Sequence, residues 1–112
     1  MKLYHALFLE KGLHSQKDEI LEKIKARKWQ FDKYLIVLSN HETNQLEFFH
    51  SVLLMQKSIQ TDTLFVVGIA KGYDGAAKLV QEITQEVLDK TGKTDIRQYV
   101  LQSQQEYEEN KV

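Results

Sequence analysis

The sequence predicts a small three-layer α/β/α domain, Rossmann-like, with a parallel sheet of three strands in the order 2-1-3. Three short apolar runs, rich in β-branched and aromatic residues, are each followed by a polar segment and a stretch with helical spacing. Strands that alternate with helices favour parallel pairing through right-handed crossovers. The chain has 112 residues, enough for one hydrophobic core. We therefore expect a single domain over residues 1–102 and a polar C-terminal tail over 103–112.

The first strand and helix are expected before residue 30. Residues 3–9 are almost continuously apolar, which is typical of a strand covered on both faces. Ser15 is followed three residues later by Asp18, a pattern similar to a capping box, so a helix is expected from there to about Lys28. The residues expected to face the core from this helix are Ile20, Leu21 and Ile24.

The second pair comprises a strand over residues 34–38 and a helix over about 45–59. Between them lies a polar segment, residues 39–44, whose residue types favour turns and helix caps. The apolar arc of the expected helix is wider than one contact with a sheet requires, which indicates an additional interface. The chain is therefore expected to form a homodimer through Phe48, Val52, Met55 and Ile59.

The third pair is a strand over residues 64–69 and a helix over about 75–90, which Gly92 ends as the C′ residue. Residues 95–101 fit either a fourth, edge strand or a helical turn. The polar residues that follow are expected to be frayed, or helical at best.

Composition excludes several classes of protein. The formal net charge is -1, so the global basic field of a dedicated nucleic-acid binder is absent, although residues 23–30 carry a local basic run. The chain has no cysteine, which removes disulfides and thiolate chemistry and fits a reducing compartment. No apolar run is long enough for a signal peptide or a membrane span. We expect a cytoplasmic protein with no cofactor and no bound metal.

A glycine-containing loop at residues 70–75 is the strongest candidate for a ligand site. It matches the second and third glycines of the dinucleotide pattern G-x-G-x-x-G, with alanine in the first place and Asp74 inside the loop. Exposed backbone N–H groups at a helix start suit a small anion. A structural interpretation also fits, in which Gly72 has a positive φ, Asp74 caps the helix and Gly75 permits close packing. The residues expected to bind an anionic ligand are Lys11, Gly12, Lys71, Gly72 and Gly75.

A second interpretation makes the same sheet edge catalytic. His14, His41 and Asp74 would meet there in a parallel sheet, as a small hydrolase or transferase site that could depend on a metal. Their spacing carries no metal signature, however, and no serine lies in a Gly-x-Ser-x-Gly elbow. The sequence therefore favours a non-catalytic binding or protein-interaction module.

Overall fold

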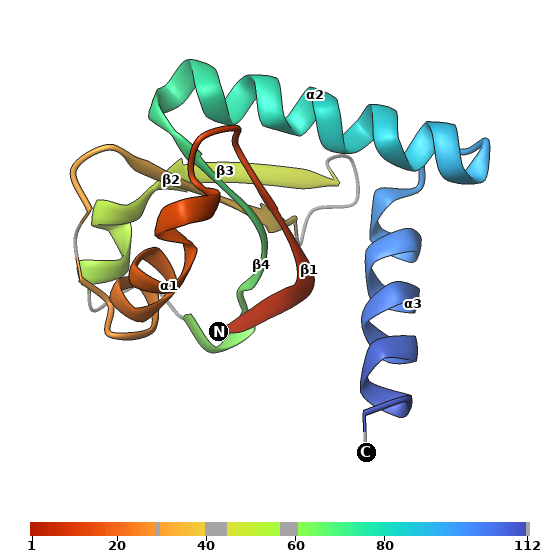
Figure 1. The fold of residues 1–112 in the computed structure, drawn as a ribbon, viewed down its shortest axis with the longest axis horizontal. Coiled ribbons are helices and arrows are strands. Elements are labelled where there is room, and N and C mark those ends of the chain that lie inside the picture. Colours follow the sequence, from red (N-terminus) through yellow and green to blue (C-terminus); the bar gives the residue numbers. More distant parts are fainter. Residues whose placement is uncertain (29, 40–44, 57–60, 112) are drawn as a thin grey trace.

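The computed structural model describes residues 1–28, 30–39, 45–56 and 61–111, and these form a mixed α/β fold (Figure 1). Among these residues, four strands make one sheet in the order β1-β4-β2-β3. β1 is parallel to β4, but β2 is antiparallel to both of its neighbours, so the predicted three-stranded parallel sheet is wrong. The strands are β1 (Lys2–Leu9), β2 (Lys33–Leu38), β3 (Leu46–His50) and β4 (Phe65–Lys71).

The predicted helix over 45–59 is the reason for this difference. Its first half is strand β3, and a 3-10 helix, η2 (Ser51–Met55), follows. Leu46 and Phe48 pack on one face of the sheet and Phe49 on the other, so apolar side chains alternate onto two covered faces. That pattern looked like a wide helical arc in the sequence. β3 begins only eight residues after the end of β2 and pairs with it antiparallel. Parallel pairing would have required a longer crossover connection, such as the expected helix.

Three α-helices complete the described fold: α1 (Lys17–Lys25), α2 (Gly72–Thr91) and α3 (Ile96–Glu109). α1 follows a 3-10 turn, η1 (His14–Gln16), and another 3-10 turn, η3 (Thr61–Thr63), precedes β4. α1 lies on one side of the sheet, α2 runs across the other side, and α3 turns away from the end of α2 beside β1 (Figure 1). No helix in the described ranges is long and apolar enough to cross a membrane.

Two apolar layers hold these elements together, one on each face of the sheet. The α1 layer buries Ile20, Ile24, Leu35, Val37, Leu54, Val66 and Ile69. The layer under α2 and α3 buries Ile36, Val67, Leu79, Ile83, Val87, Ile96 and Val100. The central strands β2 and β4 contribute to both layers, which explains their uninterrupted apolar sequences.

The break between α2 and α3 follows from two local signals. Gly92 has φ 72° and accepts the left-handed conformation that ends α2, as the sequence predicted. Three residues later, the Asp95 carboxylate accepts a hydrogen bond of 3.0 Å from the Gln98 N–H and caps α3. The segment 95–101 is therefore a helix cap followed by helix and not an edge strand, and α3 continues across the expected boundary at residue 102 to Glu109.

The hydrogen-bonded pairing of β1 with β4 is interrupted in the middle of β1. Between the pairs Leu3–Val66 and Phe8–Gly68, β1 advances five residues while β4 advances two. In this irregular stretch the His5 N–H donates to the side-chain oxygen of Gln104 at 2.8 Å, so α3 satisfies a backbone donor of the edge strand. The position of α3 is thus coupled to the shape of β1.

Candidate functional site

The predicted ligand edge exists where the parallel strands β1 and β4 end, but a carboxylate of the chain itself occupies it. Glu10 follows β1, and its Oε2 accepts a hydrogen bond of 3.2 Å from the Lys71 N–H at the end of β4. A Cβ built on Gly75 would overlap Glu10 Oε1 and lie 2.9 Å from its Cδ. Glu10 therefore lies against the first turn of α2, where its negative charge complements the helix dipole.

Some of the five residues expected to bind an anion make contacts within the protein instead. Gly72 adopts φ 75°, and its N–H donates to the Asp32 carbonyl at 2.8 Å. The Lys71 ammonium lies 3.9 Å from an Asp32 carboxylate oxygen. Lys11 and Gly12 follow β1 on the surface. An anionic ligand at α2 would therefore have to replace or approach Glu10, which costs like-charge repulsion.

The structure describes two of the three residues of the alternative site. His14 and Asp74 are exposed, in η1 and in the first turn of α2, and His41 lies outside the described residues. β2 is antiparallel to β4, so the chain leaves β2 at the sheet end opposite Glu10 and Lys71. Within the described ranges, no three His, Cys, Asp or Glu side chains are grouped to hold a metal ion.

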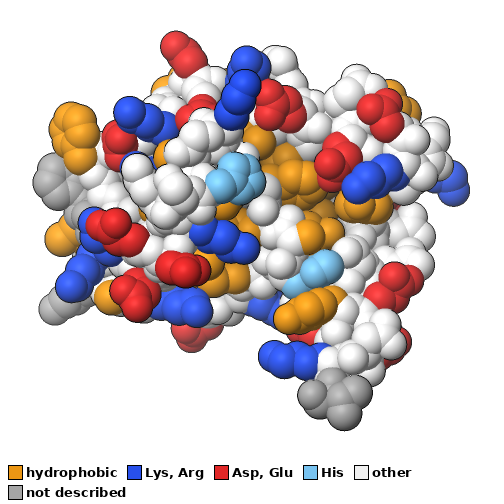
Figure 2. All heavy atoms as spheres, in the orientation of Figure 1, with side chains coloured by type: hydrophobic (Ala, Val, Ile, Leu, Met, Phe, Trp, Pro, Cys, Tyr) orange, Lys and Arg blue, Asp and Glu red, His pale blue; other side chains and the backbone are white. Residues whose placement is uncertain are grey.

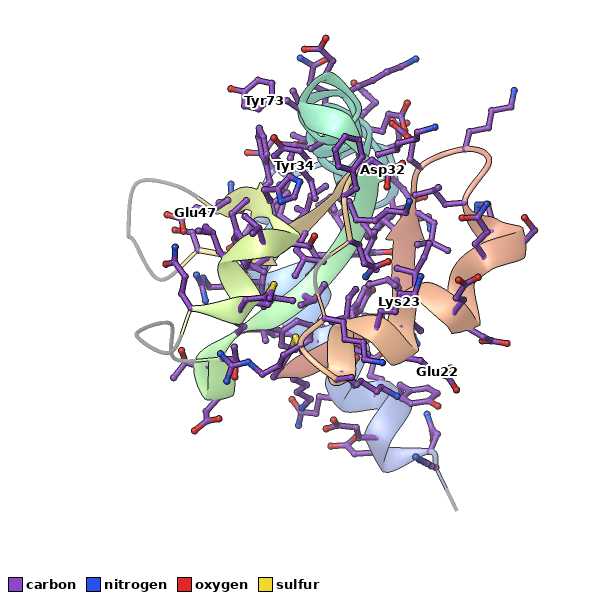
Figure 3. The ribbon with its side chains drawn as sticks, turned by 90° about the vertical axis from the view of Figure 1, so that its left-hand side faces the viewer. Glu22, Lys23, Asp32, Tyr34, Glu47 and Tyr73 are labelled. Carbon is purple, nitrogen blue, oxygen red and sulfur yellow. The ribbon has the colours of Figure 1, made fainter. Side chains whose placement is uncertain are left out.

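An ion-pair cluster and an aromatic cluster lie beside the start of α2 (Figure 3). The Lys33 ammonium, only 10% exposed, is 2.7 Å from the Asp32 carboxylate. This hydrogen bond lowers the pKa of Asp32. Tyr73 contacts Phe48 with ring centroids 5.2 Å apart, and Tyr34 lies between them and His50. Phe48 therefore packs under α2, whereas Val52 and Met55 of the expected dimer surface are exposed.

The lowered pKa of Asp32 predicts a pH-dependent contribution to stability. In the folded protein the Asp32 carboxylate has a pKa below its usual value of 3.8, whereas in the unfolded chain it has the usual value. The ion pair therefore contributes its full stabilisation above about pH 4. This contribution is lost as pH falls through the lower folded pKa. We expect Asp32→Asn to reduce the free energy of unfolding by about 1 kcal/mol at pH 7, after solvent screening of the 34% exposed carboxylate. Urea unfolding from pH 7 to pH 2 measures it.

The matched control for this prediction is Glu22→Gln, which removes an exposed carboxylate of α1. We expect the difference between wild type and Asp32→Asn to shrink toward zero at pH 2. A difference that stays constant over the whole pH range would show that the ion pair with Lys33 does not cause it.

A second region, which the sequence did not predict, has the features of a binding site. An open cleft of about 440 Å³ lies in the angle between the end of α2 and α3. The hydroxyl groups of Tyr99 and Ser103 and the amides of Gln98 and Gln102 line it. The cleft lies within the size range of small-molecule sites, but its lining is more polar than is usual for them.

The charges of the cleft favour neutral or cationic ligands. Its lining holds one basic side chain, Lys93, against the two carboxylates of Asp95 and Glu106. Gln102 Nε2 donates to Glu106 Oε1 at 3.2 Å, which orients the amide along the wall. This lining favours neutral or cationic hydrogen-bonding groups over phosphate or carboxylate groups.

α3 is fixed beside this cleft by side chains of β1. Lys2 pairs with Glu108 at 2.7 Å, and this hydrogen bond lowers the pKa of Glu108. The His5 ring stacks on Tyr107, with centroids 4.6 Å apart and planes 9° from parallel. Figure 2 shows a group of hydrophobic side chains near the centre of this face, below α2 and to the left of α3, with charged side chains around it.

The central contact between β1 and α3 is a chain of three side chains. The Tyr4 hydroxyl donates to Ser103 Oγ at 2.9 Å, and Ser103 Oγ lies 2.8 Å from His5 Nε2. Because Ser103 Oγ accepts from Tyr4, its own proton is available to His5 Nε2. The 2.8 Å contact fits the Nδ1–H tautomer of His5, which accepts from Ser103, and equally the Nε2–H tautomer, which donates to it. Ser103, the middle member of this chain, also lines the cleft.

The surroundings perturb two further groups at this corner. Burial raises the pKa of the Tyr4 phenol, which is 4% exposed. The Glu86 carboxylate raises the pKa of Lys90, and a hydrogen bond with Tyr99 acts in the same direction. Tyr99 therefore links the end of α2 to the wall of the cleft. Perturbed groups beside a cleft are typical of functional sites, although structural ion pairs produce them as well.

Sequence reasoning missed this corner because its parts are far apart in the chain. His5 and Ser103 are 98 positions apart, and His5 had been assigned to a strand interior. The only usable signal was the helical spacing of Tyr99, Ser103 and Tyr107, which places three polar or aromatic side chains on one face of α3.

Comparison with known proteins adds no assignment: no family model, no curated protein and no solved structure matches the chain. The interpretation therefore depends on the geometry of the chain alone.

Proposed function

We propose that the protein is a small-molecule-binding module whose ligand occupies the cleft between α2 and α3. The observation that carries the proposal is the 440 Å³ cleft itself, which brings hydroxyl and amide groups of one helix together beside β1. The ligand class is neutral or cationic, with groups that donate and accept hydrogen bonds. This replaces the anionic ligand expected at the sheet edge, where Glu10 supplies the negative charge.

A titration followed by amide NMR tests the binding role. A panel of small neutral, cationic and anionic molecules is screened, and the shifted amides are assigned. We expect neutral or cationic compounds to shift the amides of Gln98, Tyr99 and Gln102. Gln102→Leu is expected to weaken binding roughly threefold to tenfold, because a ligand hydrogen bond contributes about 0.5–1.5 kcal/mol.

The control is Gln81→Leu, the same substitution on an exposed position of α2 away from the cleft lining. It should leave the dissociation constants unchanged. Shifts confined to other surfaces, or equal affinity in Gln102→Leu and wild type, would contradict the proposed site. Shifts at Lys11, Gly12 and Gly75 with anionic compounds would instead support the sheet-edge site.

A homodimer remains a prediction. Its expected helix is absent and Ile59 lies outside the described residues, but Val52 and Met55 are 41% and 58% exposed in η2. Phe31, 80% exposed, belongs to the same end of the molecule, because its carbonyl lies 2.8 Å from Nε2 of His50, the residue that precedes η2. These exposed apolar side chains favour a protein contact at this end.

A further inference from the structure

We propose that Ser103 is a nucleophile for small esters, with His5 as its general base and Tyr4 as the hydrogen-bond donor beside it. The inference rests on the proposed function, because the cleft that binds the ligand would bring the ester carbonyl to Ser103. It goes beyond that function by assigning a reaction to the site.

The geometry meets the first requirement of an activated serine. A general base must lie within about 2.6–3.2 Å of the hydroxyl oxygen that it deprotonates. His5 Nε2 lies 2.8 Å from Ser103 Oγ. Tyr4 donates to the same oxygen, and in the Nδ1–H tautomer of His5 the imidazole Nε2 accepts the Ser103 proton.

The imidazole is also held in place, as the reaction requires. Its ring is stacked against Tyr107 and lies edge-on to Tyr4, with centroids 4.8 Å apart. The backbone of His5 is fixed by the Gln104 side chain. Ser103 belongs to α3 and His5 to β1, and these two elements are joined by the hydrogen bond between the His5 N–H and Gln104.

The Ser103–His5 pair is not needed merely to attach α3 to β1. Val100 of α3 is fully buried, and the Lys2–Glu108 pair and the Gln104 hydrogen bond already attach the helix to β1. Ser103 differs from these contacts because it also lines the cleft. A ligand in the cleft would thus lie next to a serine whose hydroxyl is hydrogen-bonded to a histidine.

The reaction is ordinary ester hydrolysis in two steps. Ser103 Oγ bonds to the acyl carbon, His5 Nε2 takes the serine proton, and the bond from the acyl carbon to the alcohol oxygen breaks as that oxygen recovers the proton. Water then bonds to the acyl carbon, His5 takes a proton from the water, and Ser103 Oγ leaves with it. Tyr4 donates to Ser103 Oγ, so it stabilises the negative charge that develops on this oxygen as its proton moves to His5.

The experiment uses p-nitrophenyl acetate and a fluorophosphonate probe with the full chain. We expect a burst of p-nitrophenolate close to one equivalent per chain, and mass spectrometry should locate the phosphonyl group on Ser103. Ser103→Ala should abolish both signals. Ser15→Ala, which removes an exposed serine in η1, should change neither.

His5 variants separate a base from a structural contact. A positioned general base contributes about 10²–10⁴-fold, so we expect His5→Gln, which retains a hydrogen-bonding side chain, to slow the burst about a hundredfold or more. Added imidazole should restore part of the rate in His5→Ala, a rescue that a purely structural histidine would not produce. Circular dichroism confirms that each variant is folded.

The outcomes separate this inference from the proposed function. Cleft amides that shift with ligands, together with labelling of Ser103 no faster than of Ser15, would overturn the nucleophile and leave the binding role standing. Labelling of Ser103 that His5 substitution does not slow would overturn the role of His5 as a base. Labelling at Ser103 without any ligand-induced shift in the cleft would support the nucleophile and contradict the proposed ligand site.

Discussion

Ile83→Ala is expected to lower the free energy of unfolding by about 2–5 kcal/mol, the range for a buried Ile or Leu reduced to Ala. Ile83 has no exposed surface and lies in the middle of the apolar stripe of α2. The side chain belongs to the same buried layer as Ile36 and Val67 of the two central strands. The substitution would leave a cavity between the sheet and the helix that these rigid neighbours fill only in part.

Urea unfolding followed by circular dichroism measures this loss. Leu88→Ala is the control, since it also truncates an aliphatic side chain of α2, but one that is 39% exposed. Its effect should be well below that of Ile83→Ala. Because domains of this kind are stable by about 5–15 kcal/mol, the Ile83 variant should unfold at a much lower urea concentration. Equal midpoints for the two variants would contradict the assigned core.

Gly68→Val is expected to destabilise the fold by about 1–3 kcal/mol, although valine is a better strand former than glycine. A Cβ on Gly68 would lie 3.2 Å from the Phe8 carbonyl oxygen and 3.4 Å from side-chain atoms of Ile36 and Leu79. The side chains have some freedom to move. The carbonyl belongs to β1, which pairs with β4 at this position, so the backbone resists displacement.

The series Gly68, Ala and Val separates crowding from strand propensity. Crowding predicts that stability decreases at each step, since every added methyl group enters the space between β1, β2 and α2. Strand propensity alone predicts the opposite order. Thermal and urea unfolding of the three proteins measure it, and a valine variant as stable as the wild type would show that the close approach of β1 is not required.

The helix and strand content was predictable wherever one local signal dominated. The apolar runs at 3–9, 34–38 and 64–69 correspond to β1, β2 and β4, and the stripe over 75–90 lies in α2. Gly92 was identified as the end of α2 because a left-handed residue is needed there. The segment 45–59 was predicted wrongly because apolar residues on two covered faces of a strand resemble a broad helical arc.

That single error changed the expected site. With a helix between β2 and β4, all strands would run in one direction and their following loops would meet at one edge. β3 reverses the chain instead, so the exit of β2 lies away from Glu10 and Lys71. The positive φ expected for Gly72 is present. The expected cap by Asp74 is wrong, because α2 begins after Lys71, has no side-chain cap and contains Asp74 in its first turn. Gly75 is approached closely by the Glu10 side chain and not by the sheet. Which atom approaches Gly75 could not be read from the sequence.

The sequence by itself determined the mixed α/β class, the positions of three strands and of the long helix, and the glycines that the turns require. These follow from side-chain periodicity and backbone sterics, which act over a few residues. Only the tertiary structure decided the strand directions, the placement of Glu10 at the start of α2, and the meeting of Tyr4, His5 and Ser103 beside a cleft. Those features depend on contacts between segments up to 99 positions apart, and local preference carries no information about such pairs.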